Sequence, residues 1–587
     1  MKNRKGRRSR NKATCNEDAA GSGNGDRISK LPNHLLLNIL ERVDTLDAAR
    51  TCILSKQMLN LPAMLSRLDL DIASIARHTD ENSEFTIRDV VRINGAVADV
   101  TENIMVARRK DITIRKLRVR FILRRYDCLS IGRSVARAMA THKVEAAEFE
   151  IVTEKVREGC TAADLLNFAT QFNTFLGASP DAFAGLTRLR LDNMRFGESG
   201  IPNILRTCKR LKSLHLTYCD SGINSTLQVE HAQLVEFFID YGNFQKVELF
   251  CLPKLEQVSY NNWVSCEDPL SFVFVPRLSK LSLTKAGTRS HKTLELSQLL
   301  ADVPSITDLN LDFESEKIWV LPECPTLLAP VLGELQFVNL DNLPEGCDIA
   351  WTMFILEAAP SVKELCIAVR DHWCTIVTDK KLRREYGYFD KANVEWKPSA
   401  SNFRHKNLAK LTIYGFQPDD NFLGYISRVM EAAVNLEEIS LHDRKSCNGY
   451  CGGDLEPKFK VCPSRYPQTP EERMGVREML GITSSRVVHF VSCGSLRVLI
   501  ELGLASYLYD LQVLGCVMRR FFTKEQLANV MILFCVAFYI QKSLIYGCFT
   551  LYFFFYFDRK IGSNFPIVSL TSSGLDSARL KLQPGTE

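Results

Sequence analysis

Residues 186–191, LTRLRL, and residues 211–216, LKSLHL, both have leucine at their first, fourth and sixth positions. In an extended chain, side chains two residues apart point to the same side. The last two leucines of each stretch therefore face one side, and the residue between them faces the other. This alternation predicts a strand with one buried face and one open face.

The same pattern recurs along the middle of the chain, with conservative replacements of leucine. The ten units begin at Leu186, Leu211, Leu234, Leu255, Leu278, Ile306, Leu332, Val362, Leu408 and Leu436. Most steps lie in or near the 20–29 residues typical of a leucine-rich repeat. Helical stretches such as IPNILRTCK (201–209) and ISRVMEAAVN (426–435) lie between strands. We expect an α/β solenoid over residues 114–445, a curved parallel sheet with outer helices.

The residues between the paired leucines should line the open face of this sheet. They are chemically mixed, which suits a surface that recognises another protein, although each one could also simply solvate the sheet. The seventh unit is assigned as Leu332, Leu335 and Phe337, so its in-between residue is Gln336. The candidate contacts with a protein partner are Arg190, His215, Phe238, Ser282, Asn310 and Gln336.

A second patterned region lies near the start of the chain, in LPNHLLLNIL (31–40) and DAARTCILSKQ (47–57). Proline suits the first turn of a helix, and the leucines and isoleucines after Pro32 recur on one helical face. Thr45 and Ser55 can begin two more helices. Three short helices bury too little surface to be stable alone, so part of their apolar face should belong to a partner.

These residues resemble an F-box. The resemblance implies that the stretch docks on a Skp-type adaptor, which links the protein to a cullin-based ubiquitin ligase. It assigns the adaptor contacts to Leu31, Pro32, Leu35, Leu36, Ile39, Leu40, Ala49 and Leu54. The family often has an Arg-Trp pair after Ser-Lys, and this chain has Gln57-Met58 there.

Residues 403–445 resemble the FBD-like C-terminal region of plant F-box proteins with leucine-rich repeats, most closely the grass-type set. This resemblance implies a non-catalytic subunit of an E3 ubiquitin ligase that recognises a protein substrate while other subunits transfer ubiquitin. The alternatives are a repeat protein that binds partners without ligase coupling, which Gln57-Met58 favours, and a membrane-tethered form.

Composition agrees with an intracellular protein of ordinary globular type. The 74 basic and 68 acidic residues leave a formal charge of +6, too weak a bias to indicate nucleic acid as a partner. The 19 cysteines are an odd number and stand in apolar segments, which favours reduced thiols in the nucleus or cytoplasm. Residues 1–25 are basic and polar, and should be disordered.

No catalytic motif stands out, and no cofactor is expected. Cys447 and Cys451 lack a second pair at zinc-like spacing, so no metal site is expected either. The remaining divisions are an F-box over 26–72, a helical linker over 73–113, a cap over 446–497 and a hydrophobic tail over 498–587.

Within the tail, two apolar runs at 530–540 and 544–557 flank Lys542. Each run is shorter than the roughly 20 residues of a membrane span. A combined span would place the lysine near mid-bilayer, at a cost of about 3 kcal/mol. A membrane anchor is feasible, but a tail that is not a working anchor is favoured.

Overall fold

The fold is described from a computed structural model of the chain. It describes residues 31–43, 45–53, 58–72, 86–124, 126–222, 225–263, 268–285, 293–315, 318–370, 394–397, 403–444, 465–482 and 487–492. All of these residues belong to one compact unit that ends at Cys493. Residues 1–25, residues 371–393 and the tail from 498 onward lie outside the described residues.

A long parallel sheet organises this unit. Its 14 strands follow one another in chain order, and every neighbouring pair is parallel. The strands are β1 (Arg67–Leu70), β2 (Ile114–Ile122), β3 (Val144–Val152), β4 (Arg188–Asp192), β5 (Ser213–Thr217), β7 (Glu236–Asp240), β9 (Gln257–Trp263), β11 (Lys280–Lys285), β12 (Asp308–Asp312), β13 (Phe337–Leu343), β14 (Glu364–Val369), β15 (Lys410–Tyr414), β16 (Glu438–His442) and β17 (Val487–Val491).

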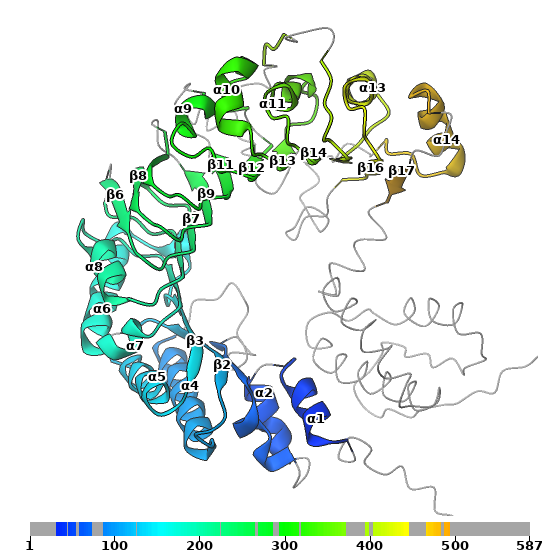
Figure 1. Cartoon of the computed structure of the whole chain (residues 1–587). Helices are drawn as coiled ribbons and strands as arrows, with labels where there is room; N and C mark the ends of the chain where they lie inside the picture. Colours follow the sequence, from blue (N-terminus) through cyan, green and yellow to red (C-terminus); the bar gives the residue numbers. More distant parts are fainter. Residues whose placement is uncertain are drawn as a thin grey trace, which may run out of the picture. The chain divides into compact units, whose positions relative to one another are not determined.

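Helices follow many of these strands and lie along one side of the sheet (Figure 1). The predicted helical stretches at 201–209 and 426–435 coincide with two of them, α8 and α13. The helices that follow β1 are α4 (Ile87–Ala107), α5 (Leu129–Thr141), α6 (Ala162–Ala178), α7 (Pro180–Ala184), α8 (Gly200–Thr207), α9 (Leu296–Leu299), α10 (Pro325–Leu332), α11 (Met353–Ala358), α13 (Asp420–Ala432) and α14 (Pro470–Met479).

Between β5 and β11 the outer layer is a second sheet, where we had expected helices. Its three parallel strands are β6 (Ser225–Glu230), β8 (Phe244–Cys251) and β10 (Leu270–Phe274). Buried apolar residues on these strands are spaced two apart, as are Leu227 and Val229 on β6 and Val247 and Leu249 on β8. A helix would instead need apolar residues three and four apart.

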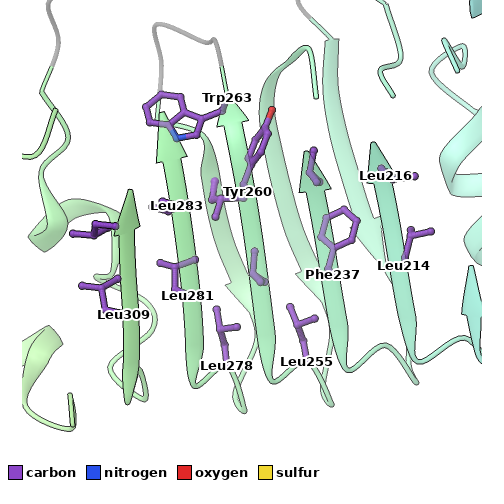
Figure 2. Packing of buried hydrophobic residues seen from close by; sticks show 14 of the residues in the cluster. Leu214, Leu216, Phe237, Leu255, Tyr260, Trp263, Leu278, Leu281, Leu283 and Leu309 are labelled. Carbon is purple, nitrogen blue, oxygen red and sulfur yellow. The ribbon is translucent and has the colours of Figure 1, made fainter. Parts of the chain in front are cut away.

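The leucine pattern fills the space between the sheet and its outer layer. Leu214 and Leu216 on β5 and Leu281 and Leu283 on β11 are buried side by side with their counterparts on neighbouring strands (Figure 2). Burying each such side chain contributes about 1.5–3 kcal/mol. The described apolar residues form one continuous core from Leu36 to Val488.

The register corrects one predicted unit. In β13, Val338 and Leu340 pair with Leu309 and Leu311, so the unit begins at Leu335 and its in-between residue is Asn339. Phe337 is exposed, because it points to the open face. The leucines at 332 and 335 mimic the spacing of a unit, but Leu332 closes helix α10.

Two predicted boundaries also differ from the structure. Residues 87–107, within the expected helical linker, do form a helix, α4, but its apolar face packs into the core through Val90, Ile93 and Val97, so it does not stand apart as a linker. The sheet also continues beyond residue 445, because β17 pairs with β16.

Phenylalanines form a cluster near the N-terminal end of the sheet. Phe175 on α6 meets Phe121 of β2 and Phe183 of α7 edge to face, with ring centroids 5.7 Å and 5.1 Å away. Phe175 is fully buried. The cluster therefore joins two helices to the sheet through one ring.

Two buried histidines, His231 and His405, make the same pair of hydrogen bonds to the backbone. The Nδ1 atoms of His231 and His405 each accept the backbone N–H two residues further along the chain. Their Nε2 atoms lie 3.1 Å from the carbonyl oxygens of Cys208 and Ala359. Since Nδ1 accepts, the proton sits on Nε2, and both rings are neutral. Burial lowers the pKa of both histidines, against a smaller raising effect of the carbonyl contacts.

Truncating the central ring should strongly destabilise the fold. We expect Phe175→Ala to lower the free energy of unfolding by about 3–5 kcal/mol, because it leaves a cavity among three other rings. Leu166→Ala on the exposed side of the same helix should cost about 0.5 kcal/mol or less. Thermal unfolding of the two variants measures the difference, and equal midpoints would contradict the packing role.

Stability should also fall in mild acid. The lowered pKa values mean that the stability provided by neutral His231 and His405 is complete above pH 6.5, their ordinary pKa, and is lost as the pH falls through the lower values of the folded state. The double variant His231→Gln/His405→Gln should unfold at a lower temperature near neutral pH and show a shallower pH dependence. The same slope as the parent would refute this role.

Candidate functional site

The first helical segment is built around Pro32. Helix α1 (Asn33–Leu40) follows it directly, and the carbonyl oxygen of Pro32 accepts the backbone N–H groups of Leu35 and Leu36. Helix α2 (Thr45–Arg50) and three short 3-10 turns, η1 (Thr51–Ile53), η2 (Met58–Asn60) and η3 (Pro62–Met64), complete the segment. Ser55 lies outside the described residues, and where a third helix was expected after it, residues 58–64 form the 3-10 turns η2 and η3.

The predicted adaptor contacts divide into two groups. Leu36 and Leu40 are only 1% and 4% exposed and belong to the protein's own core. Pro32 is exposed, and the remaining described members are half-buried: Leu31, Leu35, Ile39 and Ala49. Leu54 lies outside the described residues. The two buried leucines hold α1 in place, and the others offer surface to a partner.

Exposed apolar residues extend this surface beyond the predicted set. Ile53 is 89% exposed and Leu59 is 61% exposed, and Val43 and Met64 are also exposed. Ile53 is not among the adaptor contacts predicted from the sequence. Such a concentration of exposed apolar side chains in a short segment is typical of a docking surface.

Three polar contacts fix the segment to the sheet. Glu41 accepts both the backbone N–H and the hydroxyl of Ser66, at 2.9 Å and 2.6 Å. The hydroxyl oxygen of Thr45 accepts the backbone N–H of Asp69 at 2.6 Å. The buried Arg108, at the end of α4, donates to the carbonyl oxygen of Ala63 at 3.1 Å. Hydrogen bonds therefore join the first helical segment to β1 and to α4.

Alternating charges on the open face reinforce the pairing of the first strands. Arg118 on β2 donates to Asp69 on β1 and, at 2.7 Å, to Glu150 on β3, and Arg120 also pairs with Glu150. Burial lowers the pKa of Arg118, but the hydrogen bond to Glu150 and the neighbouring carboxylates outweigh it and raise the pKa overall. Burial likewise tends to raise the pKa of Glu150, and the arginines hold it below its usual range.

The candidate partner contacts on the repeats fall in one column of the open face. The strand registers align Arg190, His215 and Phe238 across β4, β5 and β7. The same register continues from Phe238 through Ser259 on β9 to Ser282 on β11 and Asn310 on β12. The rings of His215 and Phe238 stack with centroids 4.2 Å apart, and Asn310 donates to Ser282 at 2.9 Å.

Gln336 does not join this column. It lies just before β13, and Asn339 takes the predicted place, donating to the side-chain oxygen of Asn310 at 2.8 Å. A clue was available in the sequence, because beginning the unit at Leu335 gives steps of 29 and 27 residues, more even than the 26 and 30 of the original alignment.

No metal centre stands out in the described ranges, since no group of three or more potential ligand side chains converges there. Cys447 and Cys451 lie outside those ranges. None of the described helices is long and apolar enough to cross a membrane, and the two apolar runs of the tail lie outside the described residues.

Comparison with known protein families identifies the N-terminal segment. The model of the F-box domain matches residues 28–69, so the chain contains an F-box domain, which implies binding to a Skp-type adaptor. A search of curated protein sequences gives no match. One matching solved structure is the Toll and Spatzle complex of Drosophila, with 10% identity, a TM-score of 0.14 and coverage of 59% of this chain and 60% of that one. At that score the likeness carries no argument.

The exposed residue that the sequence interpretation missed provides a direct test of the docking surface. Ile53→Glu should weaken binding of a purified Skp-type adaptor at least about tenfold, because a charge would be buried at the interface. It should leave thermal stability unchanged, because the side chain is 89% exposed. Val106→Glu, an exposed site on α4, is the matched control. Equal calorimetric affinity of both variants would contradict the assignment.

Proposed function

We propose that the protein is the substrate-recognition subunit of a Skp–cullin–F-box ubiquitin ligase. The observation that carries this proposal is the F-box domain at residues 28–69. Its helical part carries exposed apolar residues, and its last residues form strand β1. Pro32, Leu35 and Ile39 are the proposed centre of the adaptor contact. The adaptor would connect the chain to the cullin.

The parallel sheet is proposed to be a degenerate leucine-rich-repeat solenoid of the plant, FBD-like kind. In-register Leu-x-Leu units across neighbouring strands and the outer layer of helices support this assignment. Its open face would hold the substrate, with Arg190, His215, Phe238, Ser282 and Asn310 as contacts.

The proposed mechanism is proximity, with no chemistry carried out by this chain. Binding the substrate at one end and the ligase at the other raises the effective concentration of substrate lysines near the charged ubiquitin. Proximity requires that the F-box segment be held firmly against the sheet. The hydrogen bonds of Glu41, Thr45 and Arg108 hold it there. No cofactor is required.

Location in the nucleus or cytoplasm fits this role. Cys128, Cys208 and Cys219 are free thiols in buried positions, where they act as small apolar groups. Burial raises the pKa of Cys208 to about 12, so this thiol stays protonated and unreactive. Such thiols are typical of a reducing compartment.

A second candidate function is partner binding by the repeats without ligase coupling. The departure at Gln57-Met58 favours it. Met58 is 5% exposed and packs into the core, so this side chain adds little to the surface that an adaptor could contact.

Adaptor binding by the full chain distinguishes the two functions. The full chain is needed because β1, the end of the F-box segment, pairs with β2. We expect measurable binding of a purified Skp-type adaptor in calorimetry, and its loss in the variant Leu31→Ala/Pro32→Ala, which removes the apolar entry of α1. An adaptor that does not bind the parent chain at high micromolar concentration would favour the second candidate.

A further inference from the structure

Two tyrosines at the ends of neighbouring strands form a stacked pair. Tyr218 and Tyr241 follow the last residues of β5 and β7, and their ring centroids lie 4.7 Å apart with planes 17° from parallel. Tyr241 is 44% exposed. The pair therefore presents aromatic surface at the edge of the open face.

Both tyrosines have an uncommon backbone conformation. Each has a φ angle of 51°, while Asn193 and Asn262 have φ angles of 57° at the ends of neighbouring strands. Asn193, Tyr218 and Tyr241 also donate the same kind of backbone hydrogen bond to the next strand. Positive φ is tolerated by asparagine and is unfavourable for bulky residues, by about 1 kcal/mol or more. Two adjacent strands thus carry rings where the turn itself favours a small amide.

The surroundings of the pair suit a positive charge. The guanidinium carbon of Arg157 already lies 5.7 Å from the ring centroid of Tyr218, as in a cation–π contact. Asp240 lies beside Thr217 on β7, whereas Asp192, beside Thr217 on β4, already pairs with Arg190 at 3.6 Å. Among the described residues, Asp240 accepts a hydrogen bond from the neutral side chain of Asn262 at 3.0 Å and forms no ion pair.

A second aromatic pair lies next to the tyrosines on the same strands. His215 and Phe238 stand two residues before Thr217 and Asp240, and their rings stack. Burial, with Arg188 and Arg190 nearby, lowers the pKa of His215 to about 4, so the ring is neutral at neutral pH. Each of the strands β5 and β7 therefore contributes one ring to each of two stacked, uncharged aromatic pairs.

We propose that Tyr218, Tyr241 and Asp240 bind an arginine side chain in an extended segment of the substrate. This names the substrate class and so rests on the proposed function. A planar guanidinium stacks on aromatic rings and pairs with a carboxylate through two parallel hydrogen bonds, whereas an ammonium group does neither. An extended segment would run across strands spaced about 4.8 Å apart and meet the polar side chains of Ser259 and Asn261 next.

Fluorescence anisotropy tests the charge preference. The full chain in complex with the adaptor is titrated against labelled eight-residue peptides of alternating Arg and Ser, Lys and Ser, or Gln and Ser. We expect the Arg peptide to bind at least about tenfold more tightly than the Gln peptide and more tightly than the Lys peptide. Equal binding of the Arg and Gln peptides, or tighter binding of the Lys peptide, would overturn the proposal.

The structure supplies a variant that removes the rings and preserves the turns. Tyr218→Asn/Tyr241→Asn introduces the residue that neighbouring strands carry at positive φ, so the fold should be maintained. We expect the double variant to weaken binding of the Arg peptide about fivefold or more. Asp240→Asn should weaken it to a similar extent. Phe250→Asn, on an exposed ring of the second sheet, is the matched control. Unchanged affinity in the double variant would refute the site.

Adaptor affinity is measured on the same samples. If the chain alone binds the Arg peptide selectively but does not bind the adaptor, the ligase role is refuted and the arginine site is retained. Adaptor binding without selective peptide binding would refute the arginine site alone.

Discussion

Parallel pairing in one register is the constraint on which the rest of the structure depends. Leu189, Leu214 and Phe237 stand opposite one another on successive strands, and so do Leu191, Leu216 and Ile239. A slip of one residue would turn every leucine to the open face and every polar residue into the core. The cost of such a slip is shared by neighbouring strands, which keeps the column of open-face residues continuous even where the repeat sequence is irregular.

The F-box segment follows the same constraint, because its last residues are the first strand of the sheet. Leu68 and Leu70 of β1 pair with Leu117 and Val119 of β2. The ion pairs of Arg118 with Asp69 and Glu150 lie on the opposite face and require the same register. Apolar burial on one face and charge pairing on the other thus select one alignment, and the F-box segment and the rest of the sheet share one core.

Sequence periodicity predicted the parts of the fold in which one signal dominates. The Leu-x-Leu strands and the helix after Pro32 follow from local spacing alone. The outer strands β6, β8 and β10 did not, because a short alternating segment reveals its burial only when a neighbouring segment supplies the pairing strand. Leu36 and Leu40 show a related limit for the candidate site: the pattern gives the apolar face of a helix, but tertiary contacts decide whether it faces the core or a partner.

Burial of leucines against the outer layer explains why the strand ends can carry residues whose backbone conformation is unfavourable. Each buried leucine contributes about 1.5–3 kcal/mol, whereas a tyrosine at positive φ costs about 1 kcal/mol or more. A strand such as β5, with Leu214 and Leu216 fully buried, retains its place in the sheet despite Tyr218 at its end. At the proposed arginine site, stability and recognition would lie on opposite faces of the same strand, so a change at Tyr218 or Tyr241 would alter what the sheet binds without altering the register that holds it together.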